Sequence, residues 1–399
     1  MTELLTRNRL MVLACAGAVV TANAYYVHPI VGPIAAAFAV SDGWVGAVPA
    51  TNQIALALGV LLLLPLGDRV SNRRLVFICL AAQTLALLVM ALATDFRWFL
   101  AGSTVLGFFT VTPYLLPAYA SKRVPRTQLG AVTALLTTGV IAGVLLSRTG
   151  SGVVAEYFGW RSVYGLATGL MVLATFVVPT LMDDELTTAV SSQPSYPALL
   201  GSLVTLIGRN PDVVLSGAIQ GLSFATFLAM WLGIGLHFTS ADVGLGTAVV
   251  GYLSAFSALN LLTTPRLGRW ADRVGAQSAR LRMTLVQVLG ALSLLLSLFS
   301  LWWLLVPIAL TSVAGPMIDT GGRMTFLAMD PAIRTRLMSV YITLMFVGGG
   351  LGSWAGTWAY GQGGWVGTVA MTLATSATAC ALAALAYRRS WRAANQLPV

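Results

Sequence analysis

Three ionisable side chains lie inside long apolar stretches of the chain, where a charge needs either a partner or a task. Asp319 lies in GPMIDTGGR, Arg148 in LLSRTGSG and His28 in AYYVHPIVGP. On insertion scales a charged side chain at the centre of a membrane helix costs about 2.5–3.5 kcal/mol. The carboxyl and the imidazole can exchange protons, whereas the guanidinium keeps its charge and binds anions or other acceptors.

Each of these three residues has a functional and a structural interpretation, and the sequence supports both. Asp319 either carries a proton or forms an i,i+4 ion pair with Arg323. Arg148 either anchors an anionic group of a substrate, or reaches toward the membrane surface, backbone carbonyls or Glu156. His28 either titrates near neutral pH or is a buried, neutral and hydrogen-bonded side chain.

Further polar and aromatic side chains at membrane depth are candidates for lining a substrate cavity. They are Tyr25, Tyr26, Asn23, Asn52, Gln53, Tyr114, Gln220 and Trp231. The chain has no G-x-x-x-x-G-K-[ST] phosphate loop, which argues against an ATP-driven pump. Two histidines and three scattered cysteines form no recognisable catalytic or metal-binding set, so we expect no enzyme, no metal and no cofactor.

The composition indicates that membrane helices position these residues. Of 399 residues, 57% are hydrophobic and only 9% are charged, whereas soluble domains are about 25% charged. We therefore predict an all-α polytopic protein in a lipid bilayer. The net charge of +10 lies in short gaps between apolar stretches rather than on one face, which argues against a nucleic-acid partner.

Twelve apolar stretches are long enough to cross the membrane as helices, at about 20 residues each. Their approximate bounds are 10–38, 44–66, 74–94, 97–120, 128–157, 161–182, 212–238, 244–264, 280–299, 301–328, 335–360 and 365–387. The first stretch also has signal-peptide features, a basic start and a final Ala-x-Ala. We expect a retained span, because the apolar run continues to Val40.

The distribution of Lys and Arg predicts the orientation and the domains. Gaps on the side of the two termini hold most of the basic residues, and the opposite gaps hold only Arg97 and Arg161. Both termini are therefore predicted to be cytoplasmic. Residues 1–183 and 211–399 form two predicted six-helix bundles, and residues 184–210 form a cytoplasmic linker with a short interfacial helix around Leu199 to Ile207.

The two predicted bundles share short motifs in the same order. FAVSDGWVG at 38–46 resembles FTSADVGLG at 238–246, and the Asp-Arg-Val of PLGDRV recurs in WADRV. RTQL at 126 resembles RTRL at 334, and Gly-Trp at 159 recurs at 364. The four offsets lie between 200 and 208 residues. This order predicts a duplicated six-helix unit, with the two bundles related by a pseudo-twofold axis along the membrane normal.

This organisation resembles the major facilitator superfamily of secondary transporters, whose signature is G-x-x-x-D-R-x-G-R-R. The stretch LGRWADRVG matches that signature at Gly268, Asp272, Arg273 and Gly275. The earlier stretch LPLGDRVSNRR keeps Asp68, Arg69, Arg73 and Arg74. The resemblance implies that both cytoplasmic turns act as a latch on one alternating state. The alternative is that they only fix the topology and cap helices.

The segments AYYVHPIVGPIA, LLLLPLGDR and LLSRTGSG resemble a branch of bacterial permeases usually described as efflux proteins. The antiporter signature of the fifth span survives at Gly130, Gly139 and Gly143, where we predict close helix packing. Its Pro and its final Gly pair are replaced by Val144, Ser147 and Arg148, which weakens the inference of antiport.

Together these features predict a secondary transporter. The first hypothesis is a proton-coupled exporter of small organic or drug-like molecules, with Asp319 and His28 as proton carriers and the proton gradient as energy source. The alternative is a carrier or importer of organic anions anchored by Arg148, and a non-transporting receptor is a third hypothesis without a positive feature. The resemblance implies a monomer in the bacterial inner membrane.

Overall fold

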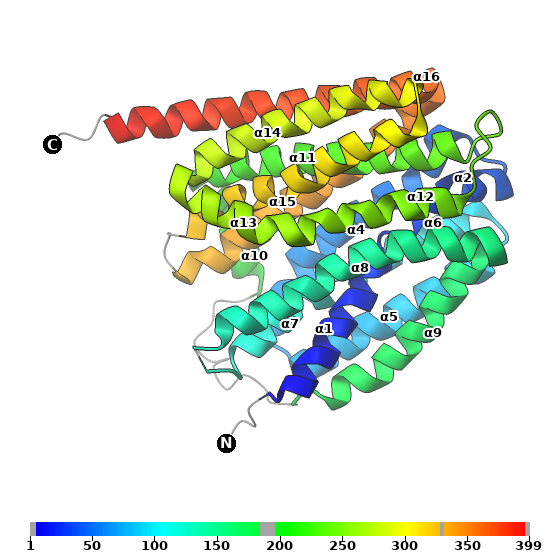
Figure 1. Cartoon of the computed structure of the whole chain (residues 1–399). Helices are drawn as coiled ribbons and strands as arrows, with labels where there is room; N and C mark the ends of the chain where they lie inside the picture. Colours follow the sequence, from blue (N-terminus) through cyan, green and yellow to red (C-terminus); the bar gives the residue numbers. More distant parts are fainter. Residues whose placement is uncertain (1–4, 126, 184–195, 328–330, 396–399) are drawn as a thin grey trace.

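Every regular element in the described part of the chain is a helix, as a backbone in lipid requires. The computed structural model describes residues 5–125, 127–183, 196–327 and 331–395 (Figure 1). The helices of the first half are α1 (Arg7–Ala22), α2 (Val27–Ala37), α3 (Asp42–Val45), α4 (Ala47–Leu63), η1 (Leu64–Asp68), α5 (Asn72–Leu92), α6 (Phe96–Phe109), α7 (Thr112–Ser121), α8 (Leu129–Phe158) and α9 (Trp160–Thr180). Those that follow are α10 (Tyr196–Arg209), α11 (Pro211–Phe238), α12 (Thr247–Ala255), η3 (Phe256–Ala258), α13 (Leu259–Val274), α14 (Ala276–Ser293), η4 (Leu294–Leu298), η5 (Leu301–Leu304), α15 (Leu305–Leu327) and α16 (Pro331–Asn395).

Ten helices in the described residues are long and apolar enough to cross a membrane. One of them, Arg336–Arg392, has 57 residues and would be about 86 Å long, nearly three times a hydrocarbon core of about 30 Å. Its backbone is non-helical at Gly364, so it contains two spans. A further span is formed by Thr247–Leu261 and Arg266–Val274, which meet at a bend of 53°. With the long helix counted as two spans, the described residues contain twelve candidate crossings, the predicted number.

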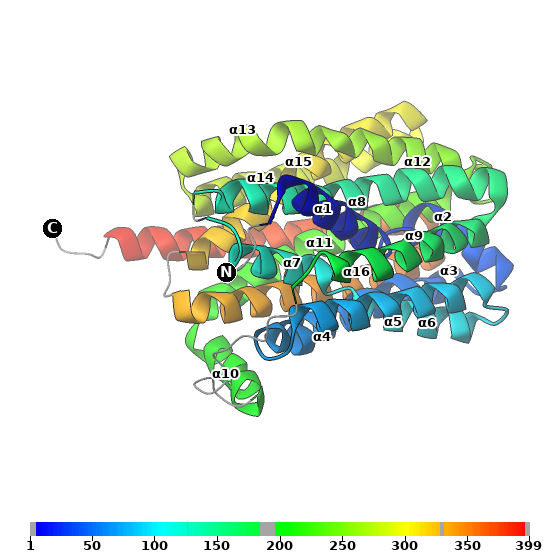
Figure 2. The ribbon, with the colours of Figure 1, turned by 90° about the horizontal axis from the view of Figure 1, so that it is seen from below.

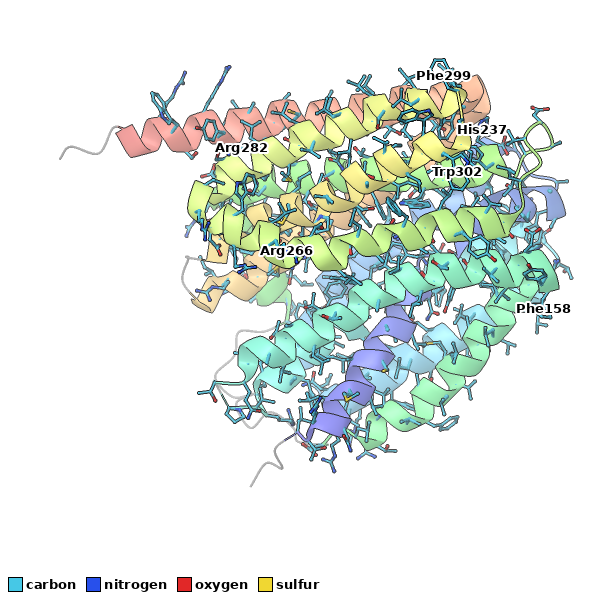
Figure 3. The ribbon with its side chains drawn as sticks, in the orientation of Figure 1. Phe158, His237, Arg266, Arg282, Phe299 and Trp302 are labelled. Atoms are coloured by element: carbon cyan, nitrogen blue, oxygen red, sulfur yellow. The ribbon has the colours of Figure 1, made fainter. Side chains whose placement is uncertain are left out.

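The helices form two bundles, with α1 to α9 in the first and α11 to α16 in the second (Figure 1). The start of α1 and the end of α16 lie toward the same end of the molecule. Arg266 and Arg282 lie toward that end, whereas Phe158, Phe299 and Trp302 lie at the opposite end (Figure 3). Following the positive-inside prediction, we call the first the cytoplasmic end and the second the outer end.

The matched motifs of the two halves make equivalent contacts in the two bundles. The rings of Phe38 and Trp160 lie 5.5 Å apart, and those of Phe238 and Trp365 lie 5.6 Å apart. The turn before each Trp contains a glycine with positive φ, 81° at Gly159 and 55° at Gly364. The repeat seen in the sequence is therefore also present in the side-chain packing.

The stretch LGRWADRVG is helical almost throughout, which corrects the prediction of a turn there. α13 continues to Gly275, where φ is 86° and α14 begins directly. Asp272 lies exposed in the last turn of α13, so it does not cap α14. In the earlier copy Ser71 caps α5, and its Oγ accepts a hydrogen bond from the Arg74 N–H at 3.5 Å. The latch role of these segments stays a prediction.

The remaining latch residues lie near these two junctions. Asp68 ends η1 and precedes Arg69, and Arg73 is exposed in the first turn of α5. Gly268 lies within α13, one turn before its last residues, and Arg273 is exposed near the end of that helix. The side chain of Asp68 lies outside the described part of the structure.

Helix α10 lies in the predicted linker and contacts both bundles at the cytoplasmic end (Figure 2). The Tyr196 hydroxyl donates a hydrogen bond to the Leu62 carbonyl of α4 at 2.7 Å. The Arg336 guanidinium of α16 donates to Ser202 Oγ at 3.0 Å. Residues 184–195 of the predicted linker lie outside the described residues.

Candidate functional site

The outer half of the boundary between the bundles is closed where α8 meets α12. A Cβ on Gly152 would lie 2.9 Å from the Gly251 Cα, so the two backbones are in direct contact. Thr247 Oγ1 donates to the Gly152 carbonyl at 2.8 Å, and the hydroxyls of Thr149 and Ser254 lie 3.0 Å apart. We call this contact the outer seam. Small residues permit such close approach of membrane helices.

A carboxylate completes the outer seam at its outer end. Glu156 of α8 accepts hydrogen bonds from Thr247 Oγ1 at 3.1 Å and from the Ala248 N–H at 3.3 Å. These two donors belong to the first turn of α12, where backbone N–H groups lack helical partners and a negative charge is favourable. One bundle therefore caps a helix of the other.

Toward the cytoplasmic end α8 lies beside α13, which continues α12 across the bend. A groove of about 720 Å³ lies between α8 and α13, lined by Leu129, Gly130, Thr133, Ala134, Thr137, Thr138, Ile141, Leu261 and Thr264. The predicted packing role of Gly130 is wrong, because no neighbouring atom lies within 4 Å of a Cβ built there. Gly139 and Gly143 do pack closely, against the backbone of Ala14 and Ala18 in α1. This boundary is thus tightly packed along the outer seam and grooved along α8 and α13.

Arg148 lies beside the outer seam and points into the centre of the molecule. Its side chain is 3% exposed, so it does not reach the membrane surface. The guanidinium carbon lies 4.7 Å from the Phe227 ring centre and 4.8 Å from that of Trp231, both on α11. Nε donates to the Val144 carbonyl at 3.3 Å. The alternative partner Glu156 is occupied at the outer seam.

Several buried polar atoms near Arg148 have no hydrogen-bond partner among the described residues. They include Arg148 Nη1, Trp231 Nε1 and both ring nitrogens of His28. The His28 ring packs edge-on to Tyr25 at 5.5 Å, and its backbone carbonyl touches α11 at Gly235. Buried polar groups normally have hydrogen-bond partners, so a cluster of unpartnered ones is typical of a site that binds a ligand or water. We call these residues the arginine centre.

Asp319 lies in a second cluster, toward the cytoplasmic end. Its carboxylate accepts hydrogen bonds from Arg323 Nε at 2.9 and 3.0 Å and from the Tyr341 hydroxyl at 2.9 Å. The i,i+4 pair is therefore formed in this state. Tyr114 of the first bundle lies within electrostatic range of both charges. We call this set the aspartate centre.

Aromatic rings from both bundles connect the two centres. Tyr114 meets Phe346 at 6.1 Å, Phe346 meets Phe224 at 5.9 Å, and Phe224 stacks on Phe227 at 6.1 Å. Phe227 in turn lies under the Arg148 guanidinium. In the described structure, aromatic rings therefore lie between the Asp319 carboxylate, which is paired with Arg323, and the Arg148 guanidinium, which has no carboxylate partner.

Other predicted cavity residues are placed within or between neighbouring helices instead. Asn52 Nδ2 donates to the Ser103 carbonyl at 2.9 Å, which joins α4 to α6. Asn23 Nδ2 donates to Gln83 Oε1 at 3.3 Å, and Tyr26 belongs to the apolar core of the first bundle. Gln53 on α4 and Gln220 on α11 are buried with amide atoms that have no hydrogen-bond partner among the described residues, so their cavity role stays a prediction.

Sequence reasoning missed the partners that give the two centres their geometry. Phe227 and Tyr341 were indistinguishable from packing residues in apolar helices. Arg280, the first residue of the predicted span 280–299, is 1% exposed and donates to Ser216 Oγ at 2.8 Å. The one signal that could have revealed its burial is its position, close to a predicted gap but on a helix that continues into the membrane.

The two bundles, the closed outer seam and the buried ionisable centres between the bundles define a polytopic membrane transporter rather than an enzyme. The family model for the Major Facilitator Superfamily matches residues 13–318. The chain belongs to this superfamily.

Relatives of the chain carry transporter names. It is 26% identical over 369 residues to the uncharacterized transporter YgaY of Escherichia coli O157:H7, covering 90% of each chain. It is 27% identical to the probable transporter SCO4007 of Streptomyces coelicolor, covering 91% of this chain and 84% of that one. Multidrug resistance protein MdtG of Serratia proteamaculans is 26% identical over 234 residues, 56% of this chain and 54% of that one.

Solved structures show the same fold. The crystal structure of a bacterial homologue of the human lysosomal transporter Spinster, inward-facing and unoccupied, aligns with a TM-score of 0.75 at 14% identity, covering 96% of each chain. The nucleoside transporter NupG aligns with a TM-score of 0.71 at 15% identity, covering 96% of this chain and 98% of that one. At these identities the likeness concerns the fold alone.

Proposed function

We propose that this transporter exports small organic molecules across the bacterial cytoplasmic membrane in exchange for protons, by rocking of the two bundles around a central site. The partial similarity to MdtG supports export. The tightly packed outer seam and the groove between α8 and α13, nearer the cytoplasmic end, support a state that loads from the cytoplasm. The bacterial relatives support the cytoplasmic membrane as location.

The observation that carries the coupling proposal is the aspartate centre. Asp319 and its partners Arg323 and Tyr341 belong to the second bundle, and Tyr114 of the first bundle packs on Phe346 of α16, the helix that carries Tyr341. Rocking the bundles changes what surrounds the carboxylate, and with it the balance between the ion pair and a bound proton. His28 offers a second proton-accepting group beside Arg148, with two unpartnered nitrogens.

The test uses everted membrane vesicles whose interior has been acidified, and a fluorescent pH probe follows the interior pH. A panel of small organic compounds is added, and a transported compound is expected to release protons from the vesicles only when the protein is present. Collapsing the gradient with nigericin and valinomycin should abolish accumulation of that compound. Accumulation that continues unchanged would contradict the coupling.

Two matched substitutions locate the coupling. Asp319→Asn should keep compound binding and lose proton release. Asp183→Asn is the control, because Asp183 is also paired with an arginine, Arg123 Nε at 3.0 Å, and contacts a tyrosine, Tyr119, but within the first bundle. Equal coupling in both variants would remove Asp319 from the mechanism.

A further inference from the structure

The cation of the arginine centre is compensated by no acid in the described residues. Arg123 pairs with Asp183 and Arg323 pairs with Asp319, whereas Arg148 has no such carboxylate partner among the described residues. A buried guanidinium without an anion is costly, and the carbonyl of Val144 together with two aromatic faces offsets only part of that cost. A bound anion would offset more.

Most of the unpartnered atoms at the arginine centre are hydrogen-bond donors. Arg148 Nη1 and Trp231 Nε1 can only donate hydrogen bonds, and the His28 ring carries at least one further N–H. A cationic ligand would meet like charge here, and a neutral ligand would leave the guanidinium uncompensated. The geometry therefore favours a ligand group with negative charge and several acceptor lone pairs.

The side chains packed around the arginine centre are largely apolar and aromatic. Tyr25, Ala24 and Leu228 form a buried cluster against which Val144, Phe224 and Phe227 pack. The rings of Phe224 and Phe227 are nearly parallel, with an interplanar angle of 12°. Such neighbours suit a ring-containing apolar body rather than a bare inorganic ion or a sugar.

We propose that the arginine centre binds small aromatic carboxylic acids as their anions, with Arg148 and Trp231 donating to the carboxylate and Phe227 and Tyr25 contacting the ring. This inference rests on the proposed transport function for its purpose and names the substrate class. Its test is equilibrium binding without any gradient, so a failure of proton coupling leaves it standing, and its own failure leaves export of other compounds standing.

The binding experiment uses the full chain in lipid nanodiscs and radiolabelled benzoate as probe. Competition by unlabelled cinnamate should displace benzoate, whereas benzamide, benzylamine and inorganic phosphate should not. Benzamide keeps the ring without the charge, benzylamine reverses the charge, and phosphate keeps an anion without a ring. Absence of saturable benzoate binding to the wild type, or equal competition by benzamide, overturns the proposal.

Three substitutions assign the contacts. Arg148→Met should lower benzoate affinity at least tenfold, and Trp231→Phe, which keeps a ring but removes the N–H, by a few-fold. Arg161→Met is the matched control, because Arg161 also stacks on an aromatic ring, Trp160 at 4.2 Å, and donates to a carbonyl, but is exposed at the outer end. It should bind as the wild type does.

A folding defect is separated from a lost contact by a conservative variant. Arg148→Lys retains the charge and loses the planar fork, so it should bind benzoate with an affinity between those of the wild type and Arg148→Met. Each variant is compared by gel-filtration profile and thermal midpoint. Wild-type affinity in a monodisperse Arg148→Met protein contradicts the assignment.

Discussion

Glu156 is expected to hold the outer seam closed, and its removal should shift the protein toward an outward-open state. The Glu156 carboxylate of α8 accepts hydrogen bonds from Thr247 Oγ1 and from the Ala248 N–H of α12. Among the outer-seam contacts described above, these are the ones that place a charge at a helix N-terminus of the opposite bundle. Glu156→Ala removes both hydrogen bonds and the charge, while Glu156→Gln keeps an acceptor oxygen and removes only the charge.

The expected size follows from these contacts. Loss of a capping side chain costs about 0.5–2 kcal/mol, and loss of a favourable charge at a helix N-terminus about 0.3–1 kcal/mol. The Ala248 contact is long, at 3.3 Å, so we expect a total of about 1–2 kcal/mol, equivalent to a shift of about 5–30-fold in the ratio of outward-open to closed molecules. Glu156→Gln should give the smaller part of that shift.

The assay measures the separation of the outer ends directly. Spin labels at the exposed residues Tyr157 and Ala241, one in each bundle, report their distance distribution by pulsed electron resonance after the native cysteines are replaced. The long-distance population should grow in Glu156→Ala. Asp95→Ala is the control, since Asp95 also caps a helix at the outer end, with 2.7 Å to the Arg97 N–H, but within one bundle. Identical distributions in Glu156→Ala and Asp95→Ala would refute the reasoning.

Two further predictions concern the boundary between the bundles. Gly152→Leu should force the outer seam apart, because even a Cβ would lie 2.9 Å from Gly251, whereas Gly150→Leu, with open space around it, should keep the wild-type label distance. If the signature segments act as a latch, Asp272→Asn and Asp68→Asn should each change the ratio of inward- to outward-open molecules without changing membrane insertion. The measurement is labelling of the protein from the cytoplasmic side. Wild-type labelling in both variants would leave the signature segments a topological role only.

Much of the architecture could be predicted because it depends on patterns of residues that are close together in the sequence. Apolar length and the placement of Lys and Arg predict the spans, and ordered motifs such as the two Gly-Trp pairs predict the repeat, since both depend on neighbours in sequence. The turn at LGRWADRVG was misplaced for the same reason. A charged segment at a helix end reads as a loop, although only Gly275 leaves the helix there.

The candidate site could be predicted only in part, because its contacts join distant helices of uniform composition. An apolar helix has no polar face, so its periodicity does not show that Phe227 and Trp231 face Arg148, or that Tyr26 turns into a bundle core while Tyr25 faces the centre. The glycines of the fifth span show the same limit. Small size alone does not reveal that Gly139 meets a neighbour and Gly130 does not.

The arginine centre and the outer seam are mechanically connected, because both depend on α8. Arg148 contacts the rings of α11, and one turn later Gly152 packs on α12, so a rigid movement of α8 that opens the outer seam also moves the guanidinium relative to Phe227 and Trp231. A ligand can shift this equilibrium only by its difference in affinity for the two states. A substrate carboxylate that binds the Arg148 guanidinium in place of the aromatic rings would lower the free-energy cost of that movement. The substrate itself would then favour opening of the outer seam.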